Sequence, residues 1–126
     1  MFKSKAVFAI MTLSLLGALL GACASAGTIS ESKARQIAEE FVKKEATFAF
    51  DGIPETLKLT GTLALKGGWE LTFEYDSRHG GYGDRTGQVL TQVITHHEAV
   101  VTVEAGTITR GIIDEKWDMI KQKTTG

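Results

Sequence analysis

The stretch that decides the fold is Trp69-Glu70-Leu71-Thr72-Phe73-Glu74-Tyr75, residues 69–75. Apolar and polar side chains alternate strictly, and this period is typical of a β-strand that is buried on one face. One face is apolar and largely aromatic, while the other carries two glutamates. A strand with one wet face predicts an antiparallel sheet whose other face is covered by a helix.

A helix that can cover such a sheet lies upstream of it. Apolar residues recur at helical spacing from Ala34 to Val42, with charged residues between them. Ser30 stands where an N-cap residue is expected, and Ile29 precedes it as a hydrophobic staple. We therefore expect a helix that begins after Ser30 and ends near Ala46.

Three more strands are expected around this core. Residues 57–65 alternate with period 2, and Gly61 within them marks a bulge or bend before a hairpin turn at Lys66-Gly67-Gly68. Residues 89–105 also have a strand-like pattern, with a break expected near His96-His97-Glu98, because one uninterrupted strand of that length is unusual.

The C-terminal part is expected to contain one strand and one helix. After a turn at Gly106, residues 108–113 form the last strand, and Asp114 caps a short helix that carries Trp117 and Ile120. The predicted fold is therefore α+β: one N-terminal helix packed on an antiparallel sheet of about four strands, with a short C-terminal helix.

The first residues have the pattern of a secretory leader. Lys3 and Lys5 precede an apolar stretch over residues 6–20, which is short for a membrane-spanning helix. The stretch ends in small residues directly before Cys23, the only cysteine of the chain. An ordinary signal peptide with a chance cysteine, or an uncut signal anchor, would also fit this pattern.

The segment Leu20-Gly21-Ala22-Cys23 resembles the lipobox of bacterial lipoproteins. The resemblance implies cleavage before Cys23 and lipid attachment to its thiol, with Leu20, Gly21 and Ala22 as recognition residues. Residues 1–22 are then a signal peptide, residues 23–28 the lipidated cysteine and its tether, and residues 29–126 one domain. Ala24, rather than an aspartate, follows the cysteine, which favours the outer membrane in a cell with two membranes.

Composition narrows the classes of function. With Cys23 lipidated, no thiol remains for a disulfide or for a cysteine-based redox or metal site. From Cys23 onward the chain has 12 basic and 15 acidic residues, a formal charge of −3. This mildly acidic balance argues against a nucleic-acid partner and against a polybasic hold on anionic lipid.

A glycine-rich segment at residues 76–87 is the candidate partner-binding loop. It contains four glycines together with two cations, a histidine and a tyrosine. The candidate binding residues are Arg78, His79, Tyr82 and Arg85, and the two arginines would form a cationic patch on an acidic protein. The segment lacks the spacing of a phosphate-binding loop.

No catalytic set is recognisable in the sequence, and no cofactor is expected. It contains neither a nucleophile-elbow motif nor the His-Glu-x-x-His metallopeptidase motif. The histidines His79, His96 and His97 raise the alternative of a metal or small ligand. His96 and His97 are adjacent in a predicted strand and point to opposite faces, so we assign no metal site.

The mature chain also resembles the PepSY family, small modules found in propeptides of secreted metallopeptidases. Ile29, Ser30, Ala34 and Ala38 match the family's helix, and Trp69-Glu70-Leu71 matches its tryptophan strand. Residues 84–89 resemble its Asp-x-x-Thr-Gly-x-Val turn, with one residue fewer between the aspartate and the threonine. The resemblance implies a PepSY-like or cystatin-like helix on a sheet, and a binding or peptidase-modulating role without catalytic residues.

These observations favour a lipid-anchored, extracytoplasmic module that binds a protein or peptide of the cell envelope and is not an enzyme. An exposed sheet edge or the glycine-rich loop would carry the contact. The alternatives are an inhibitor or chaperone of a secreted peptidase, and a metal- or small-ligand-binding lipoprotein that uses His79, His96 and His97.

Overall fold

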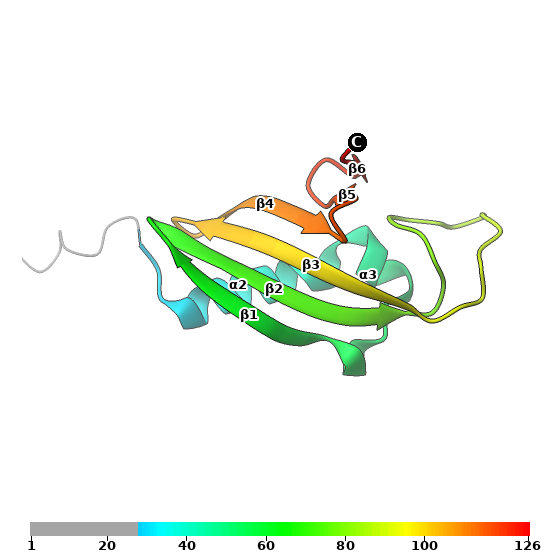
Figure 1. Ribbon diagram of the computed structural model, residues 1–126, viewed down its shortest axis with the longest axis horizontal. Helices are drawn as coiled ribbons and strands as arrows, with labels where there is room; N and C mark the ends of the chain where they lie inside the picture. The colour runs from blue at the N-terminus through cyan, green and yellow to red at the C-terminus, as the bar shows by residue number, and fades with distance from the viewer. Residues whose placement is uncertain (1–27) are drawn as a thin grey trace, which may run out of the picture.

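The computed structural model describes residues 28–126 and contains one antiparallel sheet covered by a helix on one face (Figure 1). The strands follow chain order across the sheet, from β1 to β6. The elements are α2 (Glu31–Lys44), α3 (Ala46–Asp51), the 3-10 turn η2 (Pro54–Thr56), β1 (Lys58–Leu65), β2 (Gly68–Ser77), β3 (Thr95–Glu104), β4 (Thr107–Ile113), β5 (Trp117–Asp118) and β6 (Lys123–Thr124).

The predicted N-terminal helix is present as α2. The Ser30 hydroxyl accepts a hydrogen bond from the Lys33 N–H at 3.1 Å, which caps the helix. α2 ends at Lys44, close to the predicted end near Ala46, but a second short helix that was not predicted follows it. Glu45 is extended, and its carboxylate accepts the Thr47 N–H at 3.0 Å, which starts the short helix α3.

The core lies between α2 and the inner face of the sheet. Trp69, at the start of β2, donates its indole N–H to the Ile29 carbonyl at 3.0 Å and so fixes the entry of the helix. The alternation that predicted β2 is observed, because Leu71, Phe73 and Tyr75 are buried and Trp69 is half-buried against the core. The buried apolar side chains are Ala34, Ala38, Val42, Phe48, Leu71, Phe73, Tyr75, Ala99, Val101, Val103, Ile113 and Met119.

A bulge at Thr60 and Gly61 changes which face the second half of β1 presents. Leu59 lies opposite Phe73 and packs against the core. The pairing then shifts, so Leu63 lies opposite Glu70 on the outer face and is 54% exposed. The sequence pattern marked the bulge correctly, but a continuous period of 2 over residues 57–65 predicts Leu59 and Leu63 on one face, which is wrong.

The prediction of about four strands with a C-terminal helix is wrong. The sheet has six strands, because the residues expected to form that helix instead add the two-residue strands β5 and β6. Asp114 and Glu115 have φ angles of 53° and 62°, which turn the chain back onto the sheet edge. Trp117 then pairs with Ile113 of β4.

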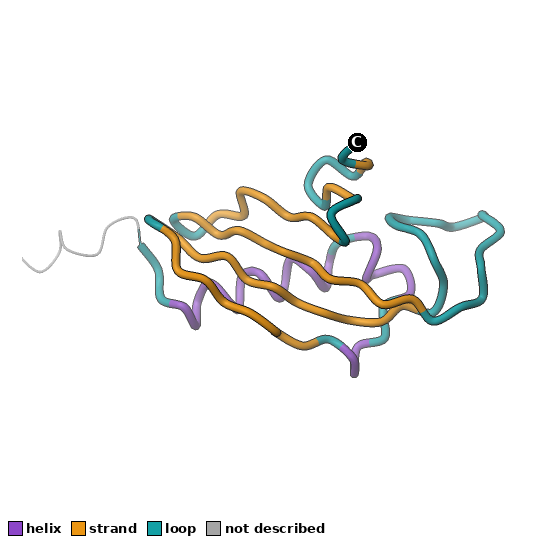
Figure 2. Tube along the Cα trace, in the orientation of Figure 1, coloured by secondary structure: helices purple, strands orange, loops and turns teal. Residues whose placement is uncertain are grey.

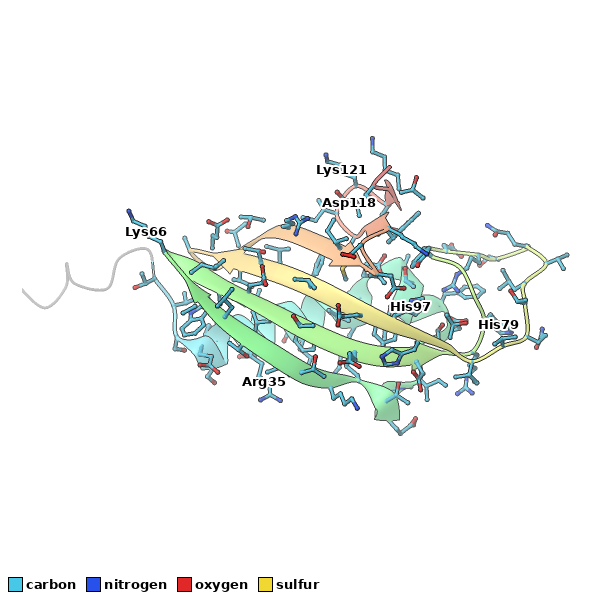
Figure 3. The ribbon with its side chains drawn as sticks, viewed as in Figure 1. Arg35, Lys66, His79, His97, Asp118 and Lys121 are labelled. Atoms are coloured by element: carbon cyan, nitrogen blue, oxygen red, sulfur yellow. The ribbon has the colours of Figure 1, made fainter. Side chains whose placement is uncertain are left out.

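The predicted strand over residues 89–105 is shortened at its beginning. β3 starts at Thr95 and pairs without interruption with β2, so the break expected near His96 does not occur. Residues 78–94 form one long loop beyond the end of the sheet (Figure 2). This loop lies at the opposite end from the β1–β2 turn and from the start of α2, as the labels His79 and Lys66 indicate (Figure 3).

Candidate functional site

The loop between β2 and β3 has two parts with different surroundings. We call residues 78–87 the anchored arm, because buried hydrogen bonds of the Gly83 N–H and of the Arg85 side chain hold it to α3. We call residues 88–94 the apolar tip, because Val89, Val93 and Ile94 within it are 103%, 58% and 60% exposed. The anchored arm contains all four residues predicted as a partner-binding loop.

Arg85 is the centre of the anchored arm and is only 2% exposed. Its guanidinium donates to the carbonyls of Gly83, Gly80 and Thr47 at 2.9, 3.0 and 3.0 Å. It also forms a 2.9 Å ion pair with the Asp51 carboxylate at the end of α3. The prediction that Arg85 contributes to a cationic surface patch is therefore wrong, because this side chain fastens the loop to α3.

Asp51 fastens a second part of the same arm. One of its oxygens, Oδ2, accepts the backbone N–H of His79 at 2.8 Å and lies 3.1 Å from the His79 Nδ1. Arg78 donates its own N–H to the Asp51 carbonyl at 3.1 Å, while its side chain is exposed. Of the two arginines predicted to form the patch, only Arg78 reaches the surface.

Tyr82 joins the loop to the C-terminal segment. Its ring stacks on Trp117, with centroids 5.8 Å apart and an interplanar angle of 8°. Its hydroxyl donates to the Asp114 carboxylate at 2.9 Å. Burial, together with this carboxylate, raises the pKa of Tyr82 to about 12. Tyr82 is thus a packing contact between two segments of the chain.

A row of polar side chains runs from the buried residues Ser77 and His97 to the partly exposed Asp114. The His97 Nε2 lies 3.2 Å from the Ser77 hydroxyl, and its Nδ1 lies 2.7 Å from the Asp114 carboxylate. A Ser-His-Asp triad has the same order of contacts. Ser77 is 0% exposed and its hydroxyl donates to the His79 carbonyl at 2.8 Å, so a substrate carbonyl does not reach it.

The Asp114 carboxylate is the meeting point of this row. Its own burial opposes ionisation, but hydrogen bonds from His97, the Glu98 N–H and Tyr82 outweigh burial and hold the pKa of Asp114 below its usual value. Asp114 therefore stabilises the junction of β3, the loop and the C-terminal segment as an anion.

The three histidines lie in separate surroundings. His79 contacts Asp51 beside α3, and His97 is buried in the row just described. His96 is exposed on the outer face, 2.8 Å from both Asp76 and Glu74, and these carboxylates raise its pKa. Within residues 28–126, no three His, Cys, Asp or Glu side chains are grouped so that they could hold a metal ion.

The outer face of the sheet is the surface that no helix covers (Figure 1). Cross-strand neighbours share a face, so the strand pairing places Val100 beside Ile112 and Thr102 beside Arg110 on this side. A cavity of about 750 Å³ opens here. Its lining residues are Glu98, Val100, Arg110, Ile112, Asp114, Glu115 and Thr125.

The cavity has an apolar floor and a charged rim. Val100 and Ile112 form the floor, and Glu98, Arg110 and Glu115 stand around it. Among the hydrogen bonds and ion pairs within residues 28–126, none uses the side chain of any of these three rim residues. Their charged groups are therefore free to contact a ligand.

The predicted lipid site lies outside the described residues. Leu20, Gly21, Ala22 and Cys23 all precede residue 28, so their roles stay predictions. In the part of the chain that the structure describes, no helix is long and apolar enough to cross a membrane.

No protein-family model, curated protein or solved structure matches this sequence. The likeness to the PepSY family, and the peptidase-directed role that rests on it, therefore stay predictions.

Sequence reasoning missed the residues that build both the buried network and the cavity. Glu45 accepts hydrogen bonds from Trp117 at 3.1 Å and Gln122 at 2.8 Å, across more than seventy positions of the chain. Arg110 and Ile112 lie in a strand that the sequence predicted correctly. They line the cavity only because the pairing of β4 with β3 places them beside Glu98 and Val100. One sequence signal could have pointed to the outer sheet face as a binding surface. The solvent-facing positions of β2 carry an excess of acidic residues.

Proposed function

We propose that this protein is a lipid-anchored, extracytoplasmic binding module that holds a polypeptide segment of a partner on its uncovered sheet face. The observation that carries the proposal is the cavity of about 750 Å³ with its apolar floor and unpaired charged rim. Its volume falls in the range of ligand-binding pockets, although most of its lining residues are polar or charged rather than apolar.

The chemistry of the face suits a segment with both apolar and basic residues. Val100 and Ile112 offer the apolar contact. On the same face the acidic side chains outnumber the basic ones, which are Lys58, His96 and Arg110. The acids placed there by the strand pairing are Glu70, Glu74, Asp76, Glu98 and Glu104. Complementary charge would orient the segment and speed its association.

The anchor in this proposal is Cys23. The described domain begins only a few residues after it, so a lipid on Cys23 would keep the domain close to the membrane. Stable attachment needs more than one acyl chain. Labelling of the full chain with a fatty-acid analogue, and its loss in Cys23→Ser, tests this half of the proposal separately.

The binding half is tested by site-specific photo-crosslinking in the cell that makes the protein. A photoreactive residue at Ile112 faces the cavity, whereas one at Gln36 lies on the exposed side of α2 and serves as the control. We expect a discrete adduct from position 112, lost when Arg110 and Glu98 are both replaced by alanine. Equal adducts from positions 112 and 36 would refute the proposal.

A further inference from the structure

The apolar tip has the composition of a strand but no partner strand. Residues 86–95 contain no charged side chain, in a protein of which 23% of the residues are charged. Val89, Thr91, Val93, Ile94 and Thr95 are all β-branched, which favours extended backbone. An uncharged, exposed segment with high β-propensity and no proline is prone to pair with the same segment of another chain.

The main chain of the apolar tip is also unpaired within residues 28–126. Gln88 donates its N–H to the Arg85 carbonyl at 3.0 Å, and the next backbone ladder begins with Thr95 in β3. Between them, no backbone N–H from Val89 to Ile94 donates to another group of the described chain. These amides are free to enter a ladder with a second strand.

Both ends of the apolar tip are fixed. Arg85 is bound to α3 on one side, and Thr95 is paired with Ser77 on the other. The loop that carries the tip extends beyond the end of the sheet (Figure 2), and Val89, Val93 and Ile94 of the tip are exposed. The tip is therefore presented to other molecules, and strand formation there would extend β3 toward its N-terminus.

We propose that two copies of this protein associate by antiparallel pairing of their apolar tips, centred on Gln92. In this register Leu90 lies opposite Ile94 of the second copy, and Thr91 lies opposite its Val93. Gln92 lies opposite itself. Large aliphatic side chains then meet on one face and β-branched side chains on the other, which are favourable cross-strand pairs.

The symmetry of the segment argues for a second copy as the partner. The residues that stand two positions before and after Gln92 are leucine and isoleucine, and those one position away are threonine and valine. Because the segment carries no charge, two identical tips do not repel each other. The pairing is isologous, so it closes as a dimer.

The test is disulfide crosslinking, under mild oxidant, of full-length variants that carry one introduced cysteine in addition to Cys23. Gln92→Cys should give a covalent dimer with a yield at least about fivefold above that of Leu90→Cys, whose two copies would stand four positions out of register. Mixed Thr91→Cys and Val93→Cys chains should also crosslink. Leu63→Cys, exposed on β1, measures random collision, and the unsubstituted chain measures any reaction of Cys23.

A second pair of variants separates pairing from chance contact. Val93→Ser with Ile94→Ser, added to Gln92→Cys, should reduce the dimer yield to that of the Leu63→Cys control, while Gln88→Ser should leave it unchanged. Equal yields at positions 63, 90 and 92 would overturn the proposal. So would a crosslink from position 92 to a different protein in place of the dimer.

Discussion

Replacing Arg85 by methionine is expected to destabilise the fold strongly. The Arg85 and Asp51 side chains are 2% and 4% exposed, and the substitution removes the cation while leaving the carboxylate buried. It also leaves the carbonyls of Gly80, Gly83 and Thr47 without their donor. Breaking a buried ion pair on one side costs ~3–5 kcal/mol. A small domain has a total unfolding free energy of only ~5–15 kcal/mol.

Urea unfolding followed by tryptophan fluorescence measures this loss. With a slope of about 1.5 kcal/mol per M, the midpoint should fall by roughly 2–3 M. The matched control is Arg78→Met, in the same arm but exposed, which should change the unfolding free energy by less than ~0.5 kcal/mol. If the two variants shift the midpoint equally, the proposed anchoring by Arg85 is incorrect.

A double-mutant cycle identifies the partner. Asp51→Asn removes the charge that Arg85 neutralises, so the combined variant should lose less than the sum of the two single losses, by about 1 kcal/mol or more. Additive losses would mean that Arg85 acts through the carbonyls alone.

Three further predictions follow from the geometry. Asp114→Asn should lower the urea midpoint at neutral pH, because the hydrogen bonds to Asp114 stabilise its ionised form. The difference from the unsubstituted protein should vanish as the pH falls below 3.8, the usual pKa of an aspartate, and through the lower pKa of Asp114 in the folded state. His96→Gln should lower the free energy of unfolding mainly at acidic pH. Because the pKa of His96 is raised in the folded state, its stabilising contribution is fully present below pH 6.5 and is lost as the pH rises through the folded-state pKa. An NMR titration of His96 locates that folded-state pKa. Gly68→Ala places a Cβ 2.2 Å from the Val103 carbonyl and should cost about 1–3 kcal/mol in the same urea assay. Gly61→Ala meets nothing closer than 3.6 Å and is its control.

The apolar tip illustrates where the sequence pattern and the folded chain disagree. Residues 89–94 have the composition of a strand, yet the structure leaves them as a loop, because β2 ends at Ser77 and offers no further partner. Strand formation needs a second strand, and local propensity does not supply one. The same disagreement motivates the proposed pairing of two copies.

The prediction of a C-terminal helix was wrong for a related reason. Its spacing of Trp117 and Ile120 suited a helix, but tertiary contacts hold Trp117 elsewhere: it stacks on Tyr82 and donates to Glu45 at 3.1 Å. Short helices gain little from propensity alone, so such contacts decide the conformation.

The sequence by itself determined the helix from Glu31 to Lys44 and the alternation of β2, because a cap and a hydrophobic period are local properties of the chain. It also predicted the lipid attachment at Cys23, which the described residues do not include. Only the tertiary structure decided that Arg85 is a buried anchor, that Ser77, His97 and Asp114 meet, and that a cavity lies over Val100 and Ile112. Each of these depends on groups that are distant in sequence and that only the packing of the sheet, the loop and α3 brings within contact distance.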